Sequence, residues 1–221
     1  MPEARAAIFA NGEMPTTEWA KEWISRSDFI IAVDGGLNHC IKLGLQPSLL
    51  LGDLDSITQR QLDEWTAVGV PIERFPPEKD ATDLELALLW AAEHDFSSIL
   101  VFGALGGRID QTIANLSLLL LPEIANIDVR IITETDEIFI INREASISGS
   151  PGDIVSLLPW GGSASGVTTR RLQYPLHAAA LTPDRSRGIS NVMLQDTAAV
   201  SVDRGTLLCI HSRKSGVMPN H

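Results

Sequence analysis

Phe29-Ile30-Ile31-Ala32-Val33 is a run of five apolar residues that leads directly into Asp34-Gly35-Gly36. An apolar run without polar alternation is typical of a strand buried on both faces, as in a parallel sheet covered by helices. Outward from this run, short β-rich segments alternate with helical patterns over the first two thirds of the chain. We therefore predict an N-terminal doubly wound, mostly parallel sheet with helices on both faces.

The remaining elements of this α/β part follow from the same two periodicities. Further strands are expected at residues 6–10, 49–51, 72–75, 98–102, 129–133 and 137–141. Helices are expected at residues 17–26, 59–68, 82–94 and 109–121, together with one that is closed by Gly44. Thr82, with Glu85 three residues later, has the pattern of a capping box. Sheets of this kind bind ligands at the carboxyl ends of their strands.

The pattern changes near residue 145. Residues 146–152 are small and polar, and no convincing helix follows them. Short candidate strands with Gly and Pro between them lie at residues 154–158, 176–181, 192–194, 198–202 and 207–210. We predict an α/β domain over residues 1–145 and a small all-β sandwich over residues 146–221. A sandwich of about 70 residues buries little core, so we expect it to pack on the first domain, on a partner subunit, or on both.

Composition restricts the classes of partner. The chain has 17 Lys and Arg against 28 Asp and Glu, a formal net charge of −11, which argues against binding bare nucleic acid by phosphate neutralisation. An acidic protein can still bind a phosphate-bearing ligand through a divalent cation. No apolar stretch approaches the roughly 20 residues of a membrane span, and two distant cysteines suit a reducing compartment. We expect a cytoplasmic protein without nucleic-acid or membrane partners.

Acidic residues recur where expected strands end or where the next helix begins: Asp34, Asp53, Asp55, Asp80 and Asp83. Because side chains alternate along an extended chain, Asp53 and Asp55 are expected to point the same way. Carboxylates at one sheet edge repel each other unless a cation joins them, and oxygen ligands without His or Cys suit Mg²⁺ or Ca²⁺. Each aspartate alone is more often a turn residue or a helix cap. Together they predict a Mg²⁺-nucleotide site.

The segment Gly103-Ala104-Leu105-Gly106-Gly107-Arg108 follows an expected strand and opens a helix. It has neither the P-loop spacing nor the dinucleotide fingerprint, although its glycines allow close backbone approach and a helix N-terminus favours anions. Arg108 is either a bidentate phosphate donor or a solvated surface arginine. Asp110, in the first helical turn, is kept ionised by the helix dipole and could orient or deprotonate a hydroxyl, or neutralise a cationic substrate.

Taken together, the motifs resemble those of the thiamine pyrophosphokinase (thiamine diphosphokinase) family over nearly the whole chain. In order, they are Asp34-Gly35-Gly36-Leu37-Asn38, Gly52-Asp53-Leu54-Asp55-Ser56-Ile57, Lys79-Asp80-Ala81-Thr82-Asp83, Gly106-Gly107-Arg108-Ile109-Asp110-Gln111 and Arg187-Gly188-Ile189-Ser190-Asn191. The segment Asn11-Gly12-Glu13 also resembles the first loop of the family. Each motif alone is weak, but five in order are specific.

The resemblance implies an α/β catalytic domain, a C-terminal β-sandwich and a homodimer with active sites between the subunits. The implied reaction transfers the pyrophosphoryl group of ATP to the hydroxyl of thiamine and yields thiamine diphosphate and AMP. Thiamine as the acceptor, and attack at the β-phosphorus, come from the resemblance alone. The Mg²⁺-nucleotide site is also indicated by the residues themselves.

The resemblance further implies a role for each matching residue. Mg²⁺, and through it ATP, would be held by Asp34, Asp53, Asp55, Asp80 and Asp83. Arg108 would neighbour the phosphates, and Asp110 would orient or deprotonate the thiamine hydroxyl. Gln111, Ser190 and Asn191 would contribute to the thiamine pocket. The other implied substrate-binding residues are Asn11, Gly35, Gly36, Lys79, Thr82, Gly106 and Gly107.

One position departs from the family pattern. Residues 168–176 resemble a family stretch with a glycine before the leucine, but Arg171 stands there. An arginine would be strained if that position requires a positive φ. Two alternatives stay open: a related Mg²⁺-nucleotide-dependent transferase that acts on another alcohol, and a non-catalytic sensor of nucleotide or thiamine diphosphate. The presence of Asp110 argues against the sensor.

Overall fold

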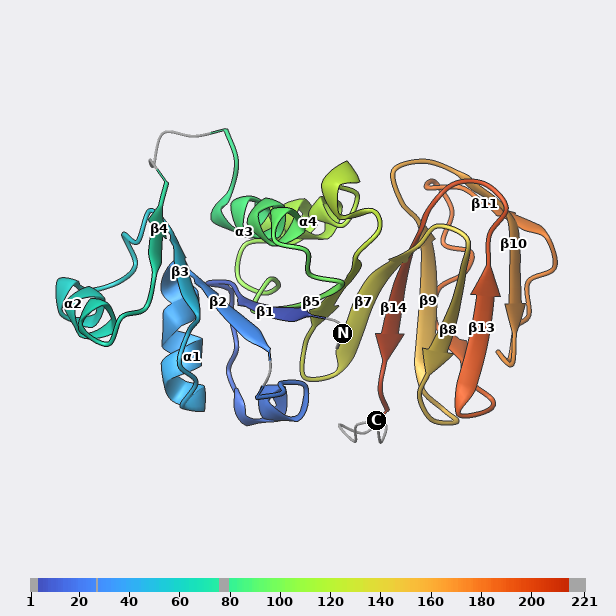
Figure 1. Ribbon diagram of the computed structural model, residues 1–221. Coiled ribbons are helices and arrows are strands. Elements are labelled where there is room, and N and C mark those ends of the chain that lie inside the picture. Colours follow the sequence, from blue (N-terminus) through green and yellow to red (C-terminus); the bar gives the residue numbers. More distant parts are fainter. Residues whose placement is uncertain (1–3, 27, 76–79, 215–221) are drawn as a thin grey trace. The chain divides into compact units, whose positions relative to one another are not determined.

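The computed structural model describes residues 4–26, 28–75 and 80–214, and the chain divides into two compact units (Figure 1). Unit 1 is Met1–Thr133 and unit 2 is Glu134–His221. The division falls before the expected boundary at residue 145. The reason is that the strands Asp136–Ile141 (β7) and Glu144–Ser148 (β8) pair with later strands of unit 2.

The described strands of unit 1 form a parallel sheet in the order β6-β5-β1-β2-β3-β4, as expected. Their bounds are Arg5–Phe9 (β1), Phe29–Val33 (β2), Leu49–Gly52 (β3), Ile72–Arg74 (β4), Ser98–Phe102 (β5) and Asp128–Ile132 (β6). The last four residues of β1, β2 and β5 are buried, which explains their continuous apolar runs. Strand order reverses at β1, because β2 lies on one side of it and β5 on the other.

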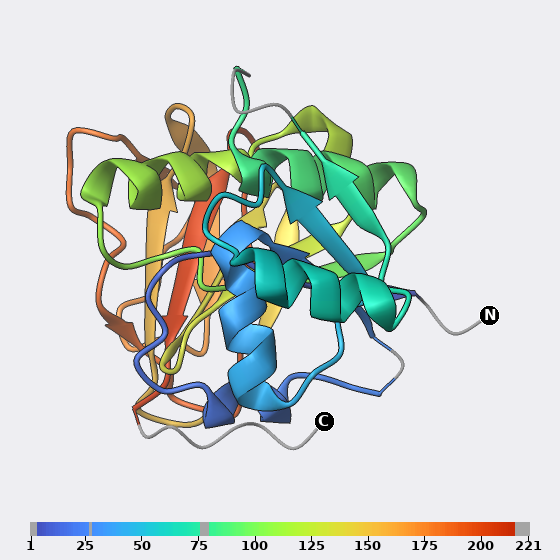
Figure 2. The same ribbon diagram turned by 90° about the vertical axis from the view of Figure 1, so that its left-hand side faces the viewer.

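Helices cover both faces of this sheet, as expected. The helices are Leu37–Leu43 (α1), Gln59–Ala67 (α2), Asp83–Glu93 (α3) and Ile109–Leu118 (α4), with 3₁₀ turns at Glu18–Glu22, Asp34–Gly36 and Pro122–Ile124. Figures 1 and 2 show α3 and α4 along one face of the sheet and α1 on the other. None of the helices in the described residues is long and apolar enough to cross a membrane.

Local chemistry sets the helix ends. Helix α1 stops where Gly44 adopts the left-handed conformation, with φ 69°. The Thr82 hydroxyl accepts a hydrogen bond from the Glu85 N–H at 3.3 Å, which is one half of the expected capping box. A complete capping box, which the sequence reading missed, starts α2: the Thr58 hydroxyl accepts from the Gln61 N–H, and the Gln61 side chain accepts from the Thr58 N–H.

Two expected helices are shorter in the structure. The helix expected at residues 17–26 is only the 3₁₀ turn Glu18–Glu22, because the amides of Ala20 and Trp23 bond to carbonyls three residues earlier. Helix α4 ends at Leu118 rather than at residue 121. Its last turn tightens to the same three-residue bonding before Pro122, which cannot continue a helix from the preceding residue.

Unit 2 is a sandwich of two antiparallel sheets, as expected. Within unit 2 the strands are ordered β12-β9-β14-β7 and β11-β10-β13-β8. The bounds not yet given are Ile154–Pro159 (β9), Ala164–Arg170 (β10), Ala179–Leu181 (β11), Asn191–Val192 (β12), Thr197–Ser201 (β13) and Leu207–Ser212 (β14). Strands β9 and β13 bury every second residue, and these residues form one hydrophobic core with those of the other strands.

Arg171 adopts φ 64°, so the position that departs from the family pattern does require a left-handed residue. It follows β10, and its carbonyl accepts a hydrogen bond from the Leu194 N–H at 3.0 Å. A left-handed conformation costs an ordinary L-residue about 1–2 kcal/mol. The arginine therefore stores local strain in unit 2.

Arg171→Gly should raise the free energy of unfolding by about 0.5–1 kcal/mol, because relief of strain exceeds the entropy that glycine loses on folding. Urea titration followed by circular dichroism measures the change. Arg170→Gly is the control: Arg170 pairs with Ala199 inside the sheet, so glycine there should destabilise the protein by about 1 kcal/mol. Equal losses in the two variants would contradict the strain at Arg171.

Candidate functional site

A cavity of about 600 Å³ lies at the carboxyl ends of the unit 1 strands. Its walls come from the segments after β1, β2, β3 and β5 and from the first turns of α3 and α4. The principal polar and glycine residues that line it are Asn11, Gly12, Glu13, Asp34, Asp53, Thr82, Asp83, Gly106, Gly107, Arg108, Gln111 and Asn115. The cavity thus lies where strand order reverses, the usual ligand position in such sheets.

The segments after β1 and β5 are joined beyond the strand ends. The Ala10 N–H donates to the Phe102 carbonyl at 2.8 Å, and the Gly12 N–H donates to the Gly103 carbonyl at 2.7 Å. A Cβ at position 12 would lie only 2.2 Å from the Gly103 oxygen, so the close approach requires glycine. These two segments form the floor of the cavity and extend the hydrogen-bond ladder between β1 and β5.

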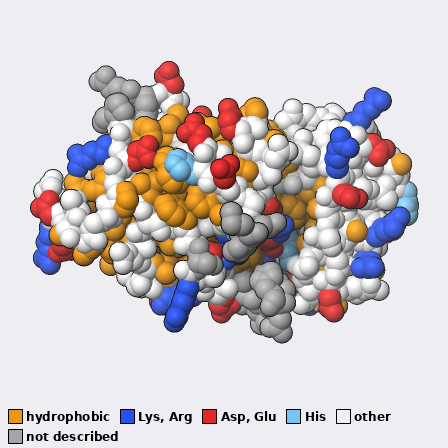
Figure 3. Space-filling model, viewed as in Figure 1, with side chains coloured by type: hydrophobic (Ala, Val, Ile, Leu, Met, Phe, Trp, Pro, Cys, Tyr) orange, Lys and Arg blue, Asp and Glu red, His pale blue; other side chains and the backbone are white. Residues whose placement is uncertain are grey.

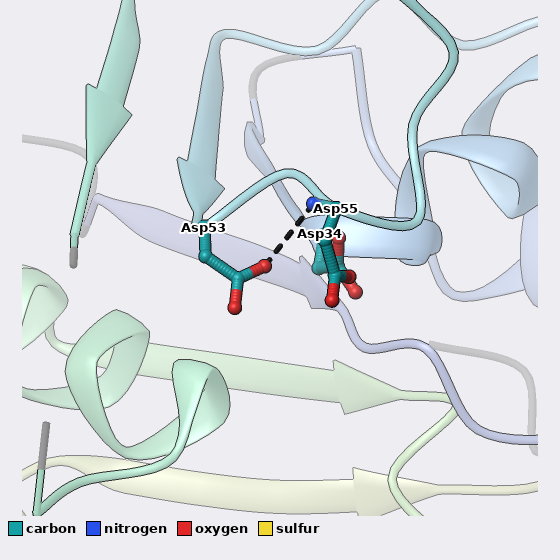
Figure 4. Close-up of side chains that lie close together, drawn as sticks. All are labelled: Asp34, Asp53 and Asp55. Carbon is teal, nitrogen blue, oxygen red and sulfur yellow. Dashed lines mark hydrogen bonds between the residues drawn. The ribbon is translucent and has the colours of Figure 1, made fainter. Parts of the chain in front are cut away.

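Three carboxylates gather beside this floor. Asp34, Asp53 and Asp55 each have an oxygen within 4.8 Å of the other two, and Figure 4 shows their side chains pointing to the same side. The approach of Asp53 and Asp55 does not come from strand alternation, which was the expected reason. Leu54 between them has φ 65°, and this turn lets the Asp55 N–H donate to Asp53 Oδ1 at 3.1 Å.

Hydrogen bonds orient these carboxylates. Asp34, only 8% exposed, accepts from the Ser56 N–H at 3.2 Å and from Asn11 Nδ2 at 3.4 Å. The Ser56 hydroxyl donates to Asp55 Oδ1 at 3.1 Å. Three oxygen-donor groups at this spacing, with no His or Cys among them, match the ligand chemistry of Mg²⁺ or Ca²⁺. The residues therefore fit a divalent cation.

The aspartates near the start of α3 differ in position. Asp83 lines the cavity, and its Oδ1 would lie 3.2 Å from a Cβ placed on Gly52, at the end of β3. Asp80 is exposed and does not line the cavity. Lys79 lies outside the described residues. Of this motif, the structure brings Ala81, Thr82 and Asp83 to the cavity.

Arg108 and Asp110 form an exposed ion pair at the start of α4. Arg108 Nη2 lies 2.5 Å from Asp110 Oδ2, and Arg108 Nε donates to Oδ1 at 3.1 Å. The hydrogen bonds from Arg108, together with the one from the Gln111 N–H, lower the pKa of Asp110 below its usual value. Arg108 and Gln111 line the cavity, whereas Asp110 does not.

Ser190 and Asn191 belong to unit 2, where the Asn191 side chain bonds to the backbone of Tyr174. Its side chain accepts from the Tyr174 N–H at 2.9 Å and donates to the Tyr174 carbonyl at 2.7 Å. Ser190 has φ 55°, and its N–H donates to the Ser156 hydroxyl at 2.9 Å. These bonds hold the residue 190 turn, whereas the thiamine contacts implied for both residues stay a prediction.

Two polar side chains of the cavity were missed by sequence reasoning as individual candidates. Asn115 Nδ2 donates to the Ala104 carbonyl at 2.7 Å and so fixes the glycine segment. Glu13 lies against the same segment, since a Cβ on Gly106 would be 3.0 Å from Glu13 Cβ. The spacing of Asn115 four residues after Gln111 places both on one helix face, which is a signal that could have found it.

The protein is thus of the doubly wound α/β class, with three clustered aspartates and a glycine segment at one cavity, an arrangement that suits a ligand bound through a divalent cation. The family model described as thiamin pyrophosphokinase, catalytic domain, matches residues 20–131, and that described as thiamin pyrophosphokinase, vitamin B1 binding domain, matches residues 139–207. The chain belongs to the thiamin pyrophosphokinase family, which confirms the resemblance of its motifs.

Thiamine pyrophosphokinases of known sequence or structure match this chain over most of their own length. A thiamine pyrophosphokinase of Bacillus subtilis (strain 168) is 30% identical, covering 82% of this chain and 86% of its own. The crystal structure of a thiamine pyrophosphokinase from Bacillus subtilis matches with a TM-score of 0.86 at 28% identity, covering 96% of this chain and 100% of that chain. A thiamin pyrophosphokinase from Candida albicans, 18% identical, has a TM-score of 0.82 over 95% of this chain and 89% of its own, a likeness of fold.

Asp53→Asn combined with Asp55→Asn should weaken divalent cation binding at least tenfold, because two of the three clustered ligands lose their charge. Calorimetric titration with Mn²⁺ as the probe measures the affinity. In EDTA the same variant should melt at an equal or higher temperature than wild type, since like-charge repulsion is relieved. Asp63→Asn, on the exposed face of α2, is the matched control. Unchanged Mn²⁺ affinity would place the metal elsewhere.

Proposed function

We propose that this protein transfers the pyrophosphoryl group of ATP to the hydroxyl of thiamine and releases thiamine diphosphate and AMP. The observation that carries the proposal is the group Asp34, Asp53 and Asp55 beside the cavity of unit 1, within the region that matches the catalytic-domain model. Family membership supplies the acceptor and the type of transfer. It does not favour a transferase for another alcohol or a non-catalytic sensor.

Mg²⁺ and ATP bind at this cavity in the proposal. Asp34, Asp53 and Asp55 hold the cation, with Asp83 beside them, and the bound cation would neutralise charge on the phosphates. Gly106 and Gly107 line the cavity without side chains and so leave the backbone accessible to the phosphates, and their positive φ favours glycine there. Arg108 and the N-terminus of α4 add positive potential at the same place.

The ion pair between Arg108 and Asp110 indicates how the thiamine hydroxyl is oriented and how the phosphates of ATP are bound. With a lowered pKa, Asp110 is a carboxylate at neutral pH and a weak base, so its role is to accept a hydrogen bond from the thiamine hydroxyl and orient it. Anionic phosphates compete with Asp110 for Arg108. The rate then comes mainly from positioning and charge neutralisation, as in other phosphoryl transfers.

Charge distribution favours a cationic substrate. Acidic and basic residues balance in unit 2, so the net charge of −11 lies on unit 1. In the view of Figure 3, acidic side chains gather around α3, whereas Lys and Arg are prominent on unit 2. The negative potential of unit 1 attracts the thiazolium cation of thiamine.

A homodimer is the assembly that we propose. No residue of α4 is buried, and Ile109 and Ile113 on one face of it are 76% and 53% exposed. A second copy of the chain that covers this face would remove the two isoleucines from water, next to Arg108 and Asp110. A location in the cytoplasm stays a prediction from composition.

Product analysis tests the function. Incubation of the purified protein with ATP, MgCl₂ and thiamine, followed by liquid chromatography, should yield AMP and thiamine diphosphate in equal amounts. AMP or ADP without a thiamine product would exclude thiamine as the acceptor.

Asp110→Asn should lower turnover at least tenfold and leave Mg²⁺-ATP affinity within threefold. Asp184→Asn, which breaks another exposed pair with a neighbouring arginine, is the control.

Ile109→Glu combined with Ile113→Glu should convert the dimer to a monomer, because two charges would be buried in an apolar contact. Size-exclusion chromatography with light scattering measures the mass. Val68→Glu is the control, since Val68 is 60% exposed at the end of α2 and lies outside the proposed contact. A wild-type monomer at micromolar concentration, or a variant that dimerises like the control, would contradict the assembly.

A further inference from the structure

His39 lies on α1, directly beneath the segments that form the floor of the cavity. It is 8% exposed, and its Nε2 lies 2.9 Å from the Gly12 carbonyl oxygen. Because a carbonyl can only accept, Nε2 carries the proton and Nδ1 carries the lone pair. Nδ1 is buried, and no hydrogen-bond partner for it is found within the described part of the chain.

A histidine in this position is unfavourable for folding by itself. A buried acceptor without a donor costs free energy, and burial lowers the pKa of His39 below its usual value, so the ring stays neutral. The other inward residues of α1 are the apolar Leu37, Cys40 and Leu43. A leucine at position 39 would match these neighbours better. An unsatisfied polar group kept beside a cavity therefore calls for an explanation in terms of the cavity.

The hydrogen bond from His39 completes the attachment of Gly12. The Gly12 N–H is held by the Gly103 carbonyl, and the Gly12 carbonyl is held by His39. The ring also packs beneath the β5 segment, since a Cβ on Gly103 would lie 3.5 Å from His39 Cδ2. The peptide groups on either side of Gly12 are thus fixed to both the sheet and α1.

The neighbours of Gly12 in the chain are residues of the cavity. Asn11 Nδ2 lies 3.4 Å from Asp34 Oδ2 and 3.4 Å from the Ser56 hydroxyl. Glu13, on the other side, packs against Gly106. A rotation of the Gly12 carbonyl toward solvent would therefore move the Asn11 side chain away from Asp34. It would also move Glu13 away from Gly106.

We propose that His39 is a positioning residue of the nucleotide site, which holds the Gly12 carbonyl and thereby sets Asn11 against Asp34. The inference rests on the proposed function, because its ligand is Mg²⁺-ATP. This role predicts that a substitution of His39 weakens Mg²⁺-ATP binding without a comparable loss of protein stability. Removal of the ring removes an unfavourable buried nitrogen together with one hydrogen bond, so stability changes little while the site loses its geometry.

His39→Leu and His39→Gln test this role. His39→Leu should keep the melting temperature within about 2 °C of wild type or raise it. The same variant should raise the Kd of Mg²⁺-ATP, measured by calorimetry, at least tenfold, and it should raise the KM for ATP more than it lowers kcat. The side-chain amide of His39→Gln can donate to the same carbonyl and should restore the Kd to within threefold. His94→Leu, which also removes a ring bonded to a backbone carbonyl but lies at the end of α3, should leave the Kd of Mg²⁺-ATP unchanged.

Two results would overturn the proposal. One is an unchanged Kd in His39→Leu, and the other is a Kd that weakens equally in the Leu and Gln variants while both lose thermal stability. The calorimetric readout needs no turnover, so a wild type that binds Mg²⁺-ATP but makes no thiamine diphosphate would reject the proposed function and still test His39. A wild type that fails to bind Mg²⁺-ATP would overturn both.

Discussion

Parallel pairing of β1 with β2 on one side and β5 on the other is the constraint on which the rest of unit 1 depends. Because all three strands point the same way, the segments that leave them meet at one edge. Asp34 and the glycine segment of the cavity lie at those exits, and Asp53 and Asp55 follow β3, which pairs in parallel with β2. The ladder continues past the strand ends through the bond from the Gly12 N–H to the Gly103 carbonyl, which ties the floor of the cavity to the sheet.

Several unfavourable features lie at this edge. Asp34 and Leu54 adopt positive φ, three carboxylates approach within 4.8 Å, and a buried nitrogen of His39 faces no donor among the described residues. Each feature opposes folding, and each one lies close to the same cavity. Strain of this kind persists only where surrounding structure over-determines it, and it marks functional sites more often than cores. The turn at Leu54 is the clearest case, because its positive φ lets the Asp55 N–H donate to Asp53 Oδ1 and brings the two carboxylates together.

Unit 2 follows a different physical pattern, and the sequence reading was less complete there. Strands β9 and β13 were expected, because alternate burial gives them alternate apolar residues. Strands β8 and β10 were missed, since they read as Glu-Ala-Ser-Ile-Ser and Ala-Ser-Gly-Val-Thr-Thr-Arg. Their place in the sheet comes from pairing with β13 on both sides, which local composition does not report. Arg171 shows the reverse: a departure from the family pattern indicated a backbone position that the structure confirms.

The sequence by itself determined the order of strands and helices in unit 1, the parallel character of its sheet and the family, because hydrophobic periodicity and short motifs are properties of neighbouring residues. It also placed Asp34, Asp53 and Asp83 at strand or helix ends. Only the tertiary structure decided that Asp80 and Asp110 stay outside the cavity wall, that Glu13 and Asn115 form part of it, and that His39 lies beneath it. These outcomes depend on contacts between residues far apart in the chain, such as Asn11 with Asp34 and Ser56, and no local pattern records the direction in which such side chains meet.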